Sequence, residues 1–131
     1  RTLAFFTAVK NLYNVGIRMA YFSDVYIDLI WEKAKKEDGY DSAKWRKDFA
    51  GAWIQKDQYG IQSPLGWEID HMVPRSQGGG DDFANLFPLH WRNNEAKGDK
   101  TPVFDTAISS EGNKNIERKQ TWTIPSNLQS K

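Results

Sequence analysis

A stretch near the middle of the chain places a strand, a glycine-rich loop, a second strand and a helix in direct succession. Alternating side chains over residues 67–73 predict the first strand, and Gly78 to Gly80 predict a loop in which the chain can reverse. Residues 86–89 predict a second short strand, and residues 90–98 predict a helix that ends at its terminal glycine. The loop therefore lets the two halves of this stretch fold back on each other.

The segments on either side predict helices before this stretch and a β-hairpin after it. We expect helices over residues 3–22, 25–38 and 43–49, a strand over 52–55, strands over 103–110 and 115–124, and a frayed tail from 124. Ser23 and Asp24 are typical of an N-cap, and Gly39 is typical of the position after a helix C-terminus. We interpret the 131 residues as one domain: a helical extension over 1–51, a core over 52–100, and a hairpin with its tail over 101–131.

Composition limits the partners and ligands of the protein. The net charge is only +1, so a nucleic acid would be held by a local basic patch and not by the field of the whole molecule. The chain has no cysteine, which excludes disulfides and cysteine-bound zinc. Residues 1–18 lack a sustained apolar run, so we expect neither a signal peptide nor a membrane span. We expect a cytoplasmic protein, with a secreted effector as the alternative; because residue 1 is Arg and not Met, a fragment of a longer protein is a further interpretation.

Four side chains of the central stretch are suited to cutting phosphodiester bonds. Asp70 can hold a hard divalent cation such as Mg²⁺, and Mn²⁺ would also serve. His71 follows directly and can act as general base, because imidazole accepts a proton near neutral pH. Asn85 lies fourteen residues after His71, and Asn94 nine residues further on, where its amide oxygen can complete the metal site from the helix.

This pattern resembles the HNH endonuclease family, whose members share the ββα-metal fold. The matching residues are Ile69-Asp70-His71-Met72-Val73-Pro74, Gly78-Gly79, Asp81, Asn85-Leu86, Leu89, Asn94 and Lys97-Gly98-Asp99. The resemblance implies an α+β fold with a ββα-metal core, which the N-terminal helices and the C-terminal hairpin would flank. It also implies a DNA endonuclease with one divalent cation on Asp70 and Asn94, His71 as general base, and Asn85 as the residue that braces the loop. RNA is the alternative substrate.

The zinc knuckle of many family members is expected to be absent. His90 and Asn93 stand where those members carry zinc-binding cysteines. For His90 we favour packing or a phosphate contact over metal ligation. Aromatic residues would replace the lost zinc in the core: Trp53, Trp67, Phe87 and Trp91.

Other polar residues near the motif have more than one interpretation. Glu68 is either a solvated strand carboxylate, which we favour, or a further metal or metal-supporting group. Asp81 and Asp82 could also be metal ligands, but we favour the interpretation that they shape the turn after the glycines and bond backbone amides. We predict contacts with the nucleic-acid backbone for at least two of four basic residues: Arg75, Arg92, Lys97 and Lys100.

Two other functions are compatible with the sequence. One is a ββα module that binds nucleic acid without cleaving it, against which the intact set of Asp70, His71 and Asn94 argues. The other is a nuclease toxin or effector domain of a longer protein, for which an inhibitor or immunity protein would be the partner.

Overall fold

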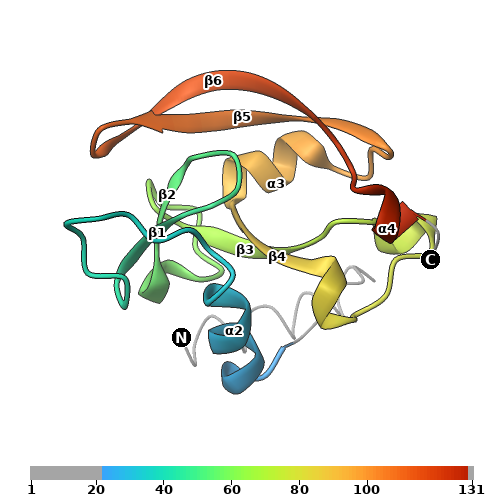
Figure 1. Ribbon diagram of the computed structural model, residues 1–131, viewed down its shortest axis with the longest axis horizontal. Helices are drawn as coiled ribbons and strands as arrows, with labels where there is room; N and C mark the ends of the chain where they lie inside the picture. Colours follow the sequence, from blue (N-terminus) through green and yellow to red (C-terminus); the bar gives the residue numbers. More distant parts are fainter. Residues whose placement is uncertain (1–21, 130–131) are drawn as a thin grey trace.

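The computed structural model describes residues 22–129 and shows an α+β fold (Figure 1). The helices are α2 (Asp24–Trp31), α3 (Trp91–Lys97) and α4 (Ser126–Gln129). The strands are β1 (Trp45–Lys47), β2 (Trp53–Gln55), β3 (Trp67–His71), β4 (Leu86–His90), β5 (Val103–Glu111) and β6 (Lys114–Thr123). Single 3₁₀ turns occur at Lys56–Gln58, Arg75–Gln77 and Phe83–Asn85.

The strands form three antiparallel pairs: β1 with β2, β3 with β4, and β5 with β6. In the middle pair Trp67 lies opposite His90, and His71 lies opposite Leu86. Figure 1 shows α3 and the long β5–β6 hairpin on one side of the β3–β4 hairpin, and α2 on the other side. The β3–β4 hairpin therefore presents one face to α2 and the other face to α3.

Two hydrophobic clusters hold these layers together. The first joins α2, β2, β3 and β4 and is made of Phe22, Ile27, Ile30, Trp31, Ala34, Ile54, Trp67, Ile69 and Leu86. Alternation along β3 explains why Trp67 and Ile69 enter this cluster while Glu68 and Asp70 turn toward α3. The second cluster lies under β5, β6 and α4 and is made of Met72, Val73, Phe104, Ile124 and Leu128.

Local signals in the central stretch and in the final hairpin predicted these elements correctly. The strands β3 and β4 and the helix α3 occur in the expected order, and Gly98 ends α3 with a φ of +53°. Gly112 adopts a φ of +58° in the turn between β5 and β6, where the sequence predicts the reversal. Ser23 is the N-cap of α2, and its hydroxyl accepts a hydrogen bond from Tyr26 N at 3.2 Å.

The prediction that α2 continues to residue 38 was wrong. The helix ends at Trp31, and Gly39 lies well beyond its C-terminus. Lys35 instead exchanges backbone hydrogen bonds with Lys47, at 2.7 and 2.9 Å, which draws residues 32–35 toward β1. The expected helix over residues 3–22 lies outside the described residues, except for its last position.

The predicted helix over residues 43–49 is also wrong, because residues 45–47 form β1 and pair with β2. Arg46 is only 3% exposed, and its guanidinium donates to the backbone oxygens of Ser42 and Glu32 at 2.8 and 3.2 Å. Contacts with distant residues thus determine the secondary structure of this segment. The predicted frayed tail is likewise ordered as far as Gln129, since Leu128 is buried in the second cluster.

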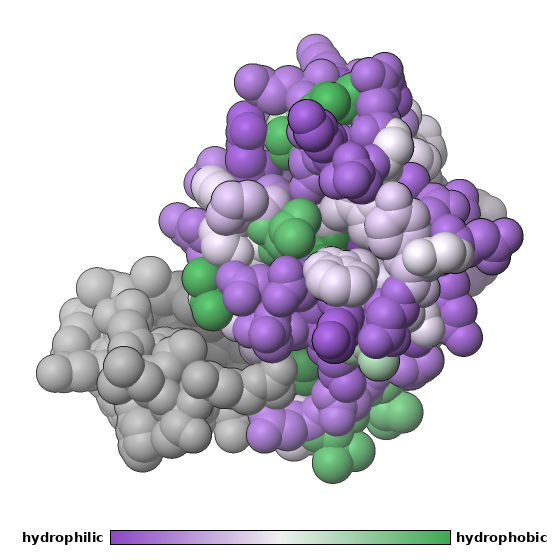
Figure 2. Space-filling view, turned by 90° about the vertical axis from the view of Figure 1, so that its left-hand side faces the viewer, coloured by the Kyte–Doolittle hydropathy of each residue, from purple (hydrophilic) through white to green (hydrophobic). Residues whose placement is uncertain are grey.

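Figure 2 shows a face on which hydrophilic residues surround a few separate hydrophobic ones. The exposed large hydrophobic residues of residues 22–129 are Val25, Leu29, Tyr40, Ile61, Phe83 and Val103. Between residues 22 and 129, no helix combines the length and the apolar character needed to cross a membrane.

Candidate active site

Asp70 is a buried carboxylate at the interface between β3 and α3. It is 5% exposed, and its Oδ1 lies 3.3 Å from Lys97 Nζ. Its Oδ2 is buried and has no hydrogen-bond partner among the described residues. Burial raises the pKa of Asp70 to about 7, although the charge of Lys97 and its hydrogen bond lower it and the nearby Glu68 raises it further. Asp70 therefore has one oxygen paired with the Lys97 ammonium and a second one without a hydrogen-bond partner in the described part of the chain.

Lys97 is inside the protein, which corrects the prediction that it contacts a nucleic-acid backbone. The residue is 0% exposed, and its Nζ donates to the backbone oxygen of His71 at 3.0 Å. The ammonium also lies 5.1 Å from the centre of the Phe104 ring. Helical spacing explains the difference, because Lys97 is three residues after Asn94 and faces β3 with it.

Asn94 is fixed by Glu68, which lies on the same face of β3 as Asp70. Its Nδ2 donates to Glu68 Oε1 at 2.7 Å. Because an ionised carboxylate only accepts hydrogen bonds, this contact assigns the nitrogen to Glu68 and leaves the amide oxygen as the other end. Glu68 is partly exposed and its carboxylate orients the Asn94 amide, whereas any role toward a metal stays a prediction. The structure brings Glu68, Asp70, Asn94 and Lys97 into one cluster.

His71 lies on the opposite face of β3 from Asp70. Its ring centre is 6.2 Å from that of Phe22, and its Nε2 lies 2.7 Å from Asp81 Oδ1. The same Asp81 oxygen also accepts a hydrogen bond from Arg75 at 3.2 Å. Since β3 ends at His71, Asp70 and His71 leave opposite faces of the strand at its last two positions.

Asn85 connects the two ends of the glycine-rich loop. Its Oδ1 accepts from Val73 N at 2.8 Å, and its Nδ2 donates to the backbone oxygens of Val73 and Gly80 at 3.1 and 3.0 Å. The side chain is 5% exposed, so these hydrogen bonds satisfy groups that are shielded from water. Gly79 is required here, because a side chain would start 1.7 Å from the Val73 oxygen. These contacts hold the loop that carries Asp81 against the end of β3.

His90 is a buried helix cap, which agrees with the packing role favoured from the sequence and not with metal or phosphate ligation. Its Nδ1 accepts from Arg92 N at 3.1 Å, so its Nε2 carries the proton and donates to Pro64 O at 2.9 Å. Both ring nitrogens are thus used by the backbone. Burial lowers the pKa of His90, which favours the neutral ring.

Asp48 ties the start of α3 to the rest of the fold, a role that the sequence analysis missed. Its two oxygens accept hydrogen bonds from Ala50 N, Ala52 N, His90 N and Asn93 Nδ2, all at 2.9–3.0 Å. Asn93 is 0% exposed, and its oxygen accepts from two consecutive backbone amides at the irregularity of β5. Burial raises the pKa of Asp48 to about 6, against the lowering effect of these donors.

The other basic residues predicted to contact nucleic acid remain at the surface. The Arg75 side chain is 48% exposed and is paired with Asp81. Arg92 Nη2 lies 3.6 Å from Glu117, and Lys100 Nζ lies 3.4 Å from the backbone oxygen of Ala96. Their contacts with a nucleic acid stay a prediction.

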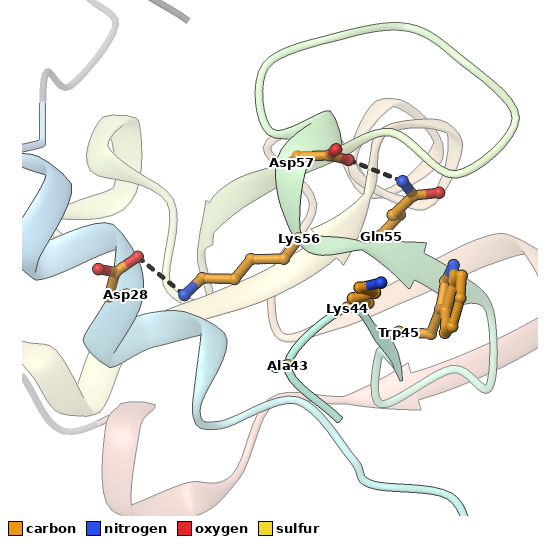
Figure 3. A pocket seen from close by; sticks show the side chains of 7 residues that line it. All are labelled: Asp28, Ala43, Lys44, Trp45, Gln55, Lys56 and Asp57. Carbon is orange, nitrogen blue, oxygen red and sulfur yellow. Dashed lines mark hydrogen bonds and ion pairs between the residues drawn. The ribbon is translucent and has the colours of Figure 1, made fainter. Parts of the chain in front are cut away.

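A hollow of about 470 Å³ between α2, β1 and β2 is separate from this cluster (Figure 3). It is lined by Asp28, Ala43, Lys44, Trp45, Gln55, Lys56 and Asp57. Figure 3 shows that Lys56 reaches Asp28, at 3.3 Å, and that Gln55 reaches Asp57, at 2.8 Å. Four polar side chains of this hollow are therefore paired with one another, and none of the predicted site residues lines it.

The described residues contain no group of three or more His, Cys, Asp or Glu side chains placed to hold a metal ion together. A cation at Asp70 would therefore need other oxygen donors, such as the Asn94 amide. Asp81 contacts His71 but was not predicted as a site residue, although the sequence contains one signal for such a role. Asp81 belongs to the motif and follows the three glycines directly.

The comparisons with known proteins agree with the position of this cluster. Residues 58–100 match the family model of the HNH endonucleases. This range contains β3, β4 and α3, with Asp70, His71, Asn85 and Asn94. No curated protein and no solved structure gives a significant match. The chain therefore carries an HNH endonuclease domain over residues 58–100.

Proposed function

We propose that this protein is a metal-dependent endonuclease that hydrolyses phosphodiester bonds in DNA. The HNH domain supports the reaction class. The observation that carries the metal dependence is the Oδ2 atom of Asp70, a buried carboxylate oxygen with no partner in the described part of the chain. A bound cation would satisfy this atom, and an orphaned buried oxygen is otherwise costly.

Asp70 and Asn94 fit a hard divalent cation. Glu68 holds the nitrogen end of the Asn94 amide, so the oxygen end is the one that remains for a ligand. Carboxylate and amide oxygens suit Mg²⁺ or Mn²⁺ better than they select zinc. When bound, such a cation stabilises the negative charge that develops on the phosphate and on the leaving oxygen.

His71 is the group that takes the proton from the attacking water in this proposal. Its ring stands at the last residue of β3, beside the loop that Asn85 braces. A phosphate placed at the end of the strand would have Asp70 on one side and His71 on the other. The opposite directions of these two side chains support a site at the strand end and not along its length.

The exposed basic residues would hold the DNA backbone. Arg75, Arg92 and Lys100 lie at the ends of the site's own loop and helix, and contacts of this kind fix position without reading sequence. Lys97 has a different role in the proposal, because it balances the buried charge of Asp70 when no cation is bound.

The test is cleavage of supercoiled plasmid by the whole chain, with Mg²⁺ and with excess EDTA. We expect cutting with Mg²⁺ and none with EDTA. The His71→Ala variant should lose about 10²–10⁴-fold in rate, because a general base contributes that much. An Asp38→Ala variant, which removes an exposed charge outside the site, should cut like the wild type.

Two results would contradict the proposal. Undiminished cutting in EDTA would exclude the metal, and a His71→Ala variant that cuts at the wild-type rate would place the base elsewhere. Binding of plasmid without any cleavage under all divalent cations would favour the non-cleaving module.

A further inference from the structure

Asp81 makes the most direct contact with the His71 ring. Its Oδ1 lies 2.7 Å from Nε2, which is short for a hydrogen bond and typical of one that involves a charged group. The carboxylate comes from the turn after the glycines, ten residues along the chain from His71. The sequence favours a turn-shaping role for Asp81, with metal ligation as the alternative, and does not predict a contact with His71.

The chemistry of the two groups decides which nitrogen of His71 carries the proton. An ionised carboxylate has no proton to donate, so Nε2 must be the donor. In a neutral imidazole the other nitrogen, Nδ1, is then the unprotonated one and can accept a proton. The contact therefore selects one of the two neutral forms of the ring, the one in which Nδ1 is the basic atom.

Further contacts hold Asp81 in place. The Tyr26 hydroxyl of α2 donates to the backbone oxygen of Asp81 at 2.9 Å. Arg75 donates to the same carboxylate oxygen that meets His71, at 3.2 Å. Asn85 fixes the preceding residue, because its amide donates to Gly80 O. A turn residue that served only its own backbone would not need anchors from α2 and from the loop before it.

We propose that Asp81 is a positioning residue that holds the His71 ring in its Nε2-protonated form and in one orientation. The side chain of Asp81 is 54% exposed, so its ion pairs add little to folding, and its contribution is to the ring. This inference rests on the proposed function, in which His71 is the general base.

The first test is the nitrogen spectrum of the imidazole rings in the metal-free protein, at a pH where both rings are neutral. The chain has only two histidines, so the spectrum contains two rings. His90 is an internal reference, because its Nδ1 accepts from the backbone and its Nε2 donates to Pro64 O. In the wild type we expect both rings to show the widely separated nitrogen shifts of a single Nε2-protonated form.

In the Asp81→Ala variant the two nitrogen shifts of His71 should move toward each other, because the ring then samples both neutral forms. The His90 shifts should stay unchanged. The Asp38→Ala control removes an exposed carboxylate elsewhere and should alter neither ring. An unchanged His71 separation in Asp81→Ala would overturn the inference, whatever the enzyme does.

The second test is plasmid cleavage with Mg²⁺. Asp81→Ala should lower kcat on the order of 10–100-fold, as is usual for groups that orient a catalytic or ligating histidine. KM should change by less than about twofold, because a ring orientation affects the chemical step more than substrate binding. Asp38→Ala should retain both values.

The outcomes separate this inference from the proposed function. If His71→Ala is inactive but Asp81→Ala keeps the wild-type kcat, Asp81 does not position the base and only this inference fails. If His71→Ala itself cuts at the wild-type rate, the proposed function fails, and the nitrogen spectrum still decides whether Asp81 holds the ring. If Asp81→Ala shows both a smaller separation of the two His71 nitrogen shifts and a lowered kcat, the proposed function and this inference are both supported.

Discussion

Replacing Lys97 with methionine tests the buried pair on which the cluster depends. The Lys97→Met change keeps most of the side-chain volume but removes the ammonium that contacts Asp70 Oδ1 and the backbone oxygen of His71. Removing one partner of a buried ion pair typically costs about 3–5 kcal/mol. The loss of the donor to His71 O is part of that cost, since an unpaired buried acceptor costs about 1–3 kcal/mol.

Protonation of Asp70 limits the loss of unfolding free energy in the Lys97→Met variant. Because burial places its pKa at about 7 even beside Lys97, Asp70 takes up a proton near neutral pH once that charge is gone. We therefore expect the lower end of the range, about 3 kcal/mol at pH 7.5, and a melting temperature lower by roughly 10 °C.

The assay is urea unfolding followed by tryptophan fluorescence, for which the chain has six tryptophans. Lys100→Met is the matched control: it removes the same charge at an exposed position three residues further on, and should change stability by less than about 0.5 kcal/mol. A double-mutant cycle with Asp70→Asn should show coupling between the two positions.

An alternative result would refute this reasoning and restore the prediction made from sequence. If Lys97→Met unfolds like the wild type, shows no coupling with Asp70→Asn, and weakens DNA binding instead, Lys97 is exposed in solution and contacts phosphate.

Further predictions concern metal binding, the Asp48 network and pH. Calorimetric titration with Mn²⁺ should show at least about tenfold weaker binding for Asn94→Ala and nearly unchanged binding for His71→Ala, because only the former is a proposed ligand; equal losses would show that His71 also binds the metal. Asp48→Ala should lower the unfolding free energy by about 3 kcal/mol or more, because four buried donors lose their acceptor, whereas Asp38→Ala should have little effect in the same urea assay. Between pH 4 and 6 the folded protein retains a proton on Asp48, whose pKa is raised from 3.8 to about 6, while the unfolded chain has released it. Asp48 should therefore lower wild-type stability by up to about 3 kcal/mol as the pH rises through this window, in addition to the effect of Asp70, whose pKa is also raised. A urea series in which Asp48→Ala keeps the wild-type slope would contradict the contribution of Asp48.

The elements that could be predicted from sequence are those specified by neighbouring residues. Alternation over residues 67–71, the stop at Gly98 and the turn at Gly112 are local signals, and each one appears in the structure. The prediction of a helix over residues 43–49 was wrong because the conformation of this segment depends on contacts with residues far away in the sequence. Arg46 reaches the end of α2, and β1 pairs with β2, so tertiary contacts override a weak helical preference.

The features of the candidate site also divide into those that local sequence predicts and those that depend on distant contacts. The placement of Asp70 and His71 at the end of a strand, and of Asn94 on the following helix, follows from motif spacing. The burial of Lys97 and the cap formed by His90 do not, because both depend on how α3 packs against β3 and on backbone groups brought from elsewhere. Asp48 lies 42 residues before the His90 amide that it accepts from, and no local pattern marks it.

The packing of α3 also explains how a strand with opposed side chains can serve one reaction. Asn94 and Lys97 lie on the same side of α3 and meet Glu68 and Asp70 on one face of β3. Lys97 also donates to the His71 backbone oxygen, and so connects the carboxylate half of the site to the strand end that carries the ring. Asp48 and Asn93 fix the first turn of the same helix to β5. A change that shifts α3 would therefore move the Asn94 amide and the support of His71 together, so the stability of this interface and the geometry of the proposed site are set by the same contacts.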